Sequence, residues 1–308
     1  MPSESARRDA SGFVIIDKPA GCTSHDVVGK IRRHFKLKGK VGHAGTLDPM
    51  ATGVLVVAVD RATRLLPYLN AADKEYVAQV TLGQSTDTLD REGKITETMP
   101  VPNDWRGRLE AAMKEALTRT AQIPPRVSAI HVDGERAHDR ARRGEEFDLP
   151  ARAVRLLELE LLSEAPLTAE ALRFRLSVEK GYYVRSFARD LGRDLGTVAH
   201  LSELRRTRSG IFAIAEAQSL ESFSGGIVTL ESMAKRLFPS VTLAAEDIRA
   251  LMQGKRHLAT PTACDANAKT AETVGMFSEE GVLVGCQKAA FEGDALLLGE
   301  DAVRFPEM

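Results

Sequence analysis

The chain has 308 residues, of which 43% are apolar and 28% charged, and its net charge is −1 at pH 7. Such a length allows one large domain and a smaller one. The apolar run at 53–59 is far shorter than the roughly 20 residues that a membrane helix needs, which argues against a membrane protein. The polar stretch 1–11 has no apolar segment typical of a secretory signal, so we expect a disordered tail and a cytoplasmic protein.

The three cysteines, Cys22, Cys264 and Cys286, form neither a C-x-x-C pattern nor an even set, so we expect no metal site. Charge is distributed unevenly along the chain. Residues 30–40 contain six Lys and Arg and no acid, whereas 209–308 contain eight basic and fourteen acidic residues. The basic stretches suit a surface that binds a polyanion, although solvated helix faces give the same count about as often.

Strands and helices are interspersed along residues 12–196. In chain order we predict a buried strand at 12–19, a helix at 26–36, a central strand at 53–59, an alternating strand at 76–83, a helix at 107–120, a second alternating strand at 171–178 and a helix at 185–196. No regular strand–helix–strand repeat is present. This favours an α+β fold with a mixed, mostly antiparallel sheet and flanking helices.

Residues 121–150 interrupt the periodic pattern with two consecutive prolines and many charges, which predicts an insertion. It could close on a ligand, although a passive surface excursion is almost equally compatible with its composition. A change of composition at 220–245 predicts a linker. The helix and strands expected after it indicate a small β-rich domain at 241–308, which leaves 12–240 as the main domain.

The stretch 41–65 joins a glycine-rich loop, which carries His43 and Asp48, to a buried apolar strand. An isolated Asp-Pro pair is usually a simple turn. Here a carboxylate and an imidazole stand beside an apolar wall, an arrangement that suits a catalytic pocket. The pattern alone does not name a reaction.

The segment GHAGTLDPMATGVLVV (42–57) strongly resembles the signature of TruB-type pseudouridine synthases, which contains their catalytic aspartate. Five further segments resemble other motifs of that family in the same order: 12–28, 73–93, 122–146, 180–196 and 199–210. The resemblance implies an isomerase that flips a T-loop uridine, position 55 of tRNA, out of the RNA and converts it to pseudouridine without a cofactor. It also implies that 121–150 grips RNA and that 241–308 is a PUA-like RNA-binding domain.

The resemblance assigns a role to each residue of the site. Asp48 is the essential nucleophile or base, Arg185 pairs with it and keeps it ionised, and Tyr76 stacks on the uracil and accepts the proton from C5. Tyr183 and Leu204 form the other wall of the uracil pocket. His43 contacts the RNA near the flipped bases.

The expected partner is the T-arm of tRNA, with phosphate contacts from 30–40 and 136–143. No obligate protein partner is implied, and we expect a monomer. The insertion departs from the family pattern at Val127, His131 and His138, where tyrosine, lysine and tyrosine are common. Two alternatives remain at this point: a non-catalytic RNA-binding or tRNA-folding protein on the same scaffold, and an enzyme of another class such as a nuclease or glycosidase.

Overall fold

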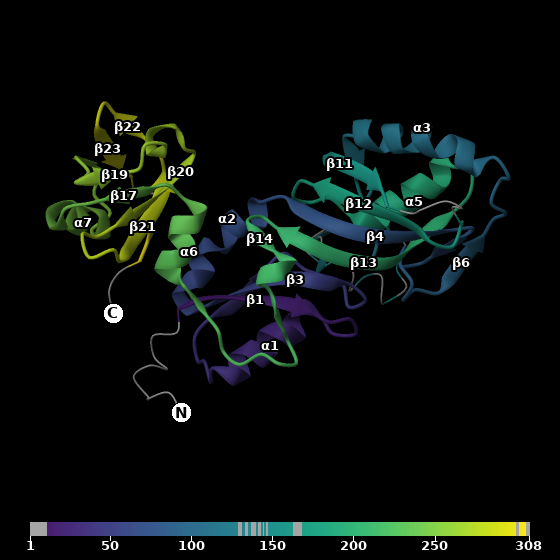
Figure 1. Ribbon diagram of the computed structural model, residues 1–308, viewed down its shortest axis with the longest axis horizontal. Coiled ribbons are helices and arrows are strands. Elements are labelled where there is room, and N and C mark those ends of the chain that lie inside the picture. The colour runs from purple at the N-terminus through teal and green to yellow at the C-terminus, as the bar shows by residue number, and fades with distance from the viewer. Residues whose placement is uncertain are drawn as a thin grey trace.

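The body of the protein is a large twisted sheet (Figure 1). The computed structural model describes residues 11–128, 131–132, 135–136, 140, 143, 145, 147–162, 168–299 and 302–305. The ten strands of this sheet follow the order β11-β12-β4-β13-β3-β1-β15, with β2, β14 and β16 attached at the side. Neighbours run antiparallel except β13 beside β3 and β15 beside β1, so the prediction of a mixed, mostly antiparallel sheet is confirmed.

The strands of the large sheet are β1 (Gly12–Lys18), β2 (Val41–Ala44), β3 (Thr52–Val59), β4 (Lys74–Leu82), β11 (Leu156–Leu161), β12 (Leu172–Val178), β13 (Ala199–Ser209), β14 (Phe212–Ala213), β15 (Gln218–Ser219) and β16 (Val228–Thr229). Strand β4 shows the predicted alternation. Its buried residues, Tyr76, Ala78, Val80 and Leu82, point into the main core, while the residues between them are half-buried. One face of the sheet therefore carries the core and the other remains partly open.

Three helices pack on the core face: α1 (Ser24–His34), α3 (Trp105–Thr118) and α5 (Val184–Asp194). Figure 1 shows α1 beside β1 and, at the other end of the sheet, α3 and α5 near β11 and β12. Helix α1 begins two residues earlier than predicted. The cause is a capping box, in which the Thr23 and Asp26 side chains each accept from the backbone N–H of the other residue.

The C-terminal part is β-rich, as predicted, and has its own apolar core. One sheet has the order β19-β17-β20-β21-β24, and a second has the order β18-β23-β22. The elements are β17 (Ser240–Thr242), α7 (Ala245–Met252), β18 (His257–Ala259), β19 (Ala263–Cys264), β20 (Thr273–Phe277), β21 (Leu283–Lys288), β22 (Phe291–Glu292), β23 (Ala295–Leu298) and β24 (Val303–Arg304). The domain boundary at 240 stays a prediction.

The interpretation of 220–245 as a linker is wrong, because it contains the helix α6 (Leu230–Leu237). Leu230 and Met233 of this helix are buried in a second core cluster. That cluster also contains Phe13 from β1 together with Phe277 and Phe305 from the C-terminal part. The two parts of the chain thus share an apolar core, with α6 between them (Figure 1).

The predicted insertion is closed at its base by β7 (Ala121–Gln122), which pairs with β10 (Arg152–Ala153). Within it, β8 (His131–Val132) pairs with β9 (Glu135–Arg136). His138 lies outside the described residues. The remaining elements are α2 (Leu66–Ala71), β5 (Gln84–Thr86), β6 (Ile95–Thr98) and three short 3-10 helices, Asp60–Leu65, Ile214–Glu216 and Ala268–Thr270.

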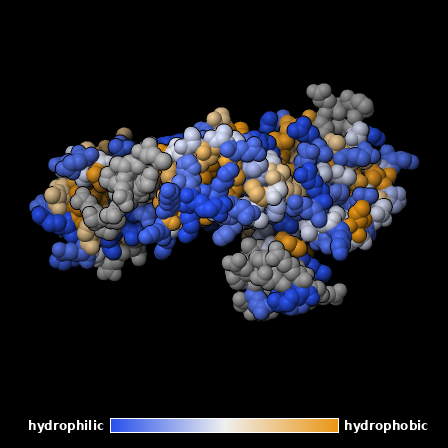
Figure 2. Space-filling model, turned by 90° about the horizontal axis from the view of Figure 1, so that it is seen from below, coloured by the Kyte–Doolittle hydropathy of each residue, from blue (hydrophilic) through white to orange (hydrophobic). Residues whose placement is uncertain are grey.

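The surface seen from the side of α1 is mostly hydrophilic, with small apolar patches between the polar side chains (Figure 2). All six basic residues of 30–40 are exposed: Lys30, Arg32, Arg33, Lys36, Lys38 and Lys40. None of the helices in the described ranges has the length and apolar character to cross a membrane.

Candidate active site

The loop between β2 and β3 carries Asp48. Hydrogen bonds to the residues on either side of Asp48 hold this loop in place. The Ser24 hydroxyl donates to the Leu47 carbonyl (3.1 Å) and accepts from the Leu47 N–H (2.9 Å). After Asp48, the Pro49 carbonyl accepts from the fully buried Lys18 ammonium (3.2 Å) and from the Gly21 N–H (2.9 Å). The backbone of Asp48 is therefore held between two fixed residues.

Buried Arg206 joins the two ends of this loop. Its guanidinium donates to the carbonyls of Gly45 (3.0 Å) and Val54 (2.7 Å). Between them, Gly53 adopts φ +107°, and a Cβ added there would lie 2.2 Å from the Arg206 carbonyl oxygen. Only glycine allows so close an approach between β3 and β13.

Arg185, near the start of α5, binds the Asp48 carboxylate at two points. Its Nε lies 3.0 Å from Asp48 Oδ2, and its Nη2 lies 3.2 Å from Oδ1. The guanidinium is buried and also donates to the carbonyls of Thr88 and Val127, both at 3.0 Å. The structure thus brings together the two residues that the resemblance pairs, and a planar guanidinium fixes the orientation of the carboxylate.

A second acid, Asp90, completes this cluster, and the sequence reasoning missed it. Its Oδ2 lies 3.5 Å from Arg185 Nη1, and the residue is 3% exposed. Its Oδ1 accepts from the Thr88 hydroxyl (2.7 Å) and from the Glu92 N–H (3.0 Å). Its position in the segment 73–93 was the available signal, but Asp90 there is an acid in a turn after a strand, and acids in turns are usually solvated.

Two opposing influences act on the Asp48 carboxyl. Burial raises its pKa, and the negative charge of Asp90 adds to the rise, whereas the Arg185 guanidinium and the Lys18 ammonium lower it. The Asp48 side chain is still 31% exposed, so part of it faces outward. A poorly solvated carboxylate held in one orientation is suited to act as a nucleophile or a base.

Tyr76 and Leu204 lie on the core face of the sheet, as β4 and β13 place them. Both belong to the apolar cluster that contains Leu47 and Met50, the neighbours of Asp48. Tyr76 is 9% exposed and Leu204 is 8% exposed. The predicted apolar wall therefore adjoins the loop that carries Asp48.

Tyr183 stands directly before α5, two residues ahead of Arg185. Tyr183 packs against Leu149, as does Phe147, and both of these residues follow the centre of the insertion. Burial raises the pKa of the Tyr183 hydroxyl, and the charge of Asp48 contributes to the rise. The residue thus lies where α5, the insertion and the Asp48 loop meet.

His43 was expected on the glycine-rich loop, but it lies in strand β2, opposite Val57 of β3. The loop prediction failed because Gly42 and Gly45 flank the residue and resemble turn signals. Burial lowers the pKa of His43, and the nearby positive charge of Arg206 lowers it further. The ring is therefore neutral at pH 7.

A cleft of about 340 Å³ opens beside the apolar wall. Met50 and Leu204 line it together with polar residues, among them Arg91, Glu203 and Arg205. Asp48, Tyr76 and Arg185 do not line it. Elsewhere in the described part of the chain, no group of three His, Cys, Asp or Glu side chains is placed to hold a metal ion.

Comparison with known proteins gives a consistent result over most of the chain. The family model for the N-terminal domain of TruB family pseudouridylate synthases matches residues 32–184, and that for the tRNA pseudouridylate synthase B C-terminal domain matches 185–244. A protein of Arthrobacter sp. (strain FB24) named tRNA pseudouridine synthase B is 42% identical over 280 residues, covering 89% of this chain and 91% of that protein. The protein of the same name from Mycobacterium bovis (strain BCG / Pasteur 1173P2) is 41% identical over 278 residues, with 89% and 88% covered.

Solved structures with a similar fold also match nearly the whole chain. A chain of an H/ACA RNP bound to a substrate RNA containing 2′-deoxyuridine superposes with a TM-score of 0.68 and 27% identity, covering 99% of this chain and 88% of that one. A chain of a Cbf5-Nop10-Gar1 complex gives a TM-score of 0.67 and 28% identity, with 98% and 88% covered.

The matches to both family models and the identity to these relatives place the chain in the class of the pseudouridylate synthases. Within that class, the chain belongs to the TruB family.

Proposed function

We propose that this protein converts a uridine in the T-loop of tRNA, position 55, into pseudouridine. The observation that carries the proposal is the two-point contact between Asp48 and Arg185 on the loop that bears the family signature. The names of the relatives, tRNA pseudouridine synthase B, support tRNA as the substrate. The choice of position 55 rests on family membership.

The reaction breaks the bond between uracil N1 and ribose C1′ and forms one between C5 and C1′. A proton leaves C5 and N1 gains one, so the overall change is an isomerisation that needs no redox partner. Asp48 acts as the nucleophile or base at the nucleoside, and Arg185 holds the carboxylate in position. The contact between Asp48 and Arg185 favours the ionised carboxylate that this role requires.

The neighbouring side chains take the remaining steps. Tyr76 stacks on the uracil, and its hydroxyl accepts the C5 proton. Leu204 and Tyr183 line the other side of the base and keep the detached uracil from leaving. His43, neutral because of its burial, supports the RNA where the flipped bases have left the stack.

The exposed basic residues of 30–40 contact RNA phosphates, and none of them has an ion pair among those found in the described residues. The second basic stretch, 136–143, is partly neutralised. Arg143 lies 2.5 Å from Glu135 and 2.6 Å from Glu145, and Arg140 lies 2.9 Å from Glu145. We therefore place the larger share of phosphate binding on α1 and the segment after it.

We further propose that the protein acts as a monomer in the cytoplasm, without a cofactor and without an obligate protein partner. Residues 241–308 form a PUA-like domain that adds contacts to the RNA. The acidic balance of 209–308 limits its phosphate binding.

An unmodified tRNA transcript incubated with the protein tests the proposal, with pseudouridine mapped by primer extension. We expect one new pseudouridine, at position 55. Asp48→Asn keeps the shape of the side chain but removes its charge, so it should bind tRNA and form no detectable product. Product at the normal rate from this variant would show that Asp48 is not the catalytic carboxylate, and no product from the unaltered protein would favour a non-catalytic RNA-binding role.

A further inference from the structure

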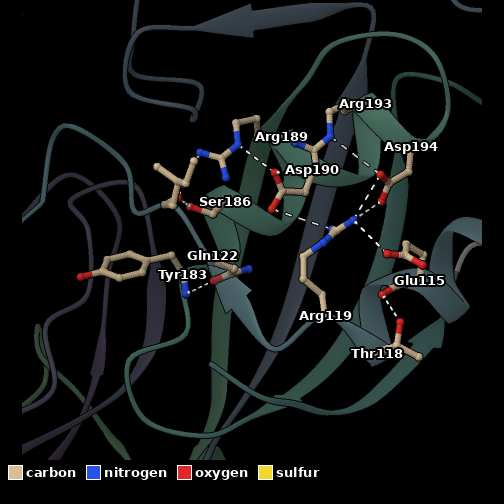
Figure 3. A network of polar contacts seen from close by, with 11 residues as sticks. Glu115, Thr118, Arg119, Gln122, Tyr183, Ser186, Arg189, Asp190, Arg193 and Asp194 are labelled. Atoms are coloured by element: carbon tan, nitrogen blue, oxygen red, sulfur yellow. Dashed lines mark hydrogen bonds and ion pairs between the residues drawn. The ribbon is translucent and has the colours of Figure 1, made fainter. Parts of the chain in front are cut away.

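Gln122 has no assigned part in the reaction, yet it holds the start of the helix that carries Arg185. Its side chain is buried, and its Oε1 accepts from the Tyr183 N–H at 3.1 Å (Figure 3). Helix α5 has no side-chain cap of its own at this end. Gln122 thus accepts the hydrogen bond of the N-cap N–H, that of Tyr183, as an N3 side chain does in a capping box.

The residues just before Gln122 are tied to the other end of α5. Arg119 ends helix α3, and its Nη2 lies 2.9 Å from Asp194 Oδ2. Its Nη1 lies 3.8 Å from Asp190 Oδ2, and Asp190 is 3% exposed. Figure 3 shows the Arg119 side chain reaching from the α3 side to both acids of α5. These ion pairs fix where the strand β7 begins relative to the helix.

The residues just after Gln122 also contact the first half of α5. The Ile123 carbonyl accepts from the Ser186 hydroxyl (2.9 Å) and from Arg189 Nη1 (3.0 Å). Further on, the Val127 carbonyl accepts from Arg185 itself. The segment 119–127 therefore runs beside the whole length of α5, with Gln122 as its contact to the N-cap.

We propose that Gln122 is a positioning residue for the reaction: by holding the N-terminus of α5, it places the Arg185 guanidinium against the Asp48 carboxylate. The inference rests on the proposed function. Arg185 lies in the first turn of α5, where a movement of the N-cap is transmitted directly. A misplacement of about 1 Å in a catalytic group can lower turnover about a hundredfold. Gln122 is uncharged and 3% exposed, so it is not placed to bind phosphates, and its effect should fall on kcat rather than on KM.

The decisive variant is Gln122→Met, which keeps the length of the side chain and removes the hydrogen bond to the Tyr183 N–H. The chain offers a matched control in Gln287 of β21, which is also buried. Gln287 donates to the Leu297 carbonyl (2.8 Å) and accepts from the Gly299 N–H (3.1 Å), far along the chain from α5. Gln287→Met therefore removes side-chain hydrogen bonds of the same kind outside the active site.

Steady-state kinetics on unmodified tRNA, together with the Tm of each variant, gives the readout. We expect Gln122→Met to lower kcat about tenfold to a hundredfold while KM changes less than about threefold. Gln287→Met should lower Tm comparably and leave kcat unchanged. A normal kcat in Gln122→Met, or a rise confined to KM, would overturn the inference, and so would an equal loss of kcat in the control.

Ser186→Ala perturbs the packing of the segment 119–127 against α5 less strongly, and it is the second variant to use if Gln122→Met does not fold. It removes the Ser186 bond to the Ile123 carbonyl and leaves Gln122 in place. We expect a loss of about threefold in kcat, comparable to one weakened hydrogen bond. An unchanged kcat in a folded Ser186→Ala protein would contradict the role of the 119–127 segment. Failure of the proposed function is distinguishable, because the unaltered protein would then make no pseudouridine.

Discussion

Replacing Arg185 with methionine tests the electrostatics of the site most directly. The variant loses the contacts to Asp48 at 3.0 and 3.2 Å, the contact to Asp90 at 3.5 Å and the bonds to two carbonyls. Removal of one partner from a buried ion pair costs about 3–5 kcal/mol, because the remaining charge stays buried. We expect a loss of this size in the free energy of unfolding, measured by urea denaturation at pH 7.

The same variant should change how activity depends on pH. In the unaltered protein, burial and Asp90 raise the pKa of Asp48, and Arg185 opposes the rise. Without Arg185 the pKa of Asp48 rises further, so the ionised carboxylate forms only at higher pH. The acidic limb of kcat/KM, measured from pH 5 to 9, should therefore move to higher pH, and activity at pH 7 should fall about a hundredfold or more. An acidic limb that stays in place or moves to lower pH would refute the reasoning.

Three further outcomes follow from the structure. Tyr76→Leu should retain tRNA affinity within about threefold but lose most of kcat, because leucine fills space without offering a hydroxyl; normal turnover would make Tyr76 a packing residue. Deletion of 241–308 removes Phe277 and Phe305 from the core shared with Phe13, so Tm should fall sharply and unfolding should cost on the order of 5 kcal/mol less; an unchanged Tm would show that the parts are independent. Binding of tRNA should weaken steeply between 50 and 200 mM salt, and a salt-independent Kd would contradict phosphate binding by 30–40.

Local patterns predicted the strands β1, β3, β4 and β12 and the three helices that pack on the sheet, but not β11 or the central strand β13. Strand β4 alternates in sequence because one of its faces is buried, and α5 was placed within two residues of its observed bounds. The helix α6 was missed because its few apolar residues follow a stretch rich in serine and glycine, which resembles a linker. Only their burial in one cluster with Phe13 of β1 and Phe277 of β20 shows that these positions are core.

The site was predicted only in part. Asp48 and Arg185 stand in motifs with a family resemblance, which indicated their pairing. Asp90 and Gln122 lie in segments that resemble family motifs, but the sequence assigns no role to either, because a buried acid and a buried amide differ from solvated ones only through their distant partners. Gln122 contacts a residue 61 positions away, and such a separation leaves no periodic trace.

The contacts of Arg185 also explain why the departure at Val127 is compatible with an intact site. Arg185 binds Asp48, Thr88 and Val127, which lie 137, 97 and 58 positions away in the chain. Residue 127 takes part through its backbone carbonyl, and any side chain leaves that acceptor in place. Since the same Nη2 donates to this carbonyl and to Asp48, a single nitrogen links the start of the insertion to the loop that carries Asp48. A valine in place of the family's tyrosine can therefore alter contacts to RNA while the geometry of the carboxylate stays the same.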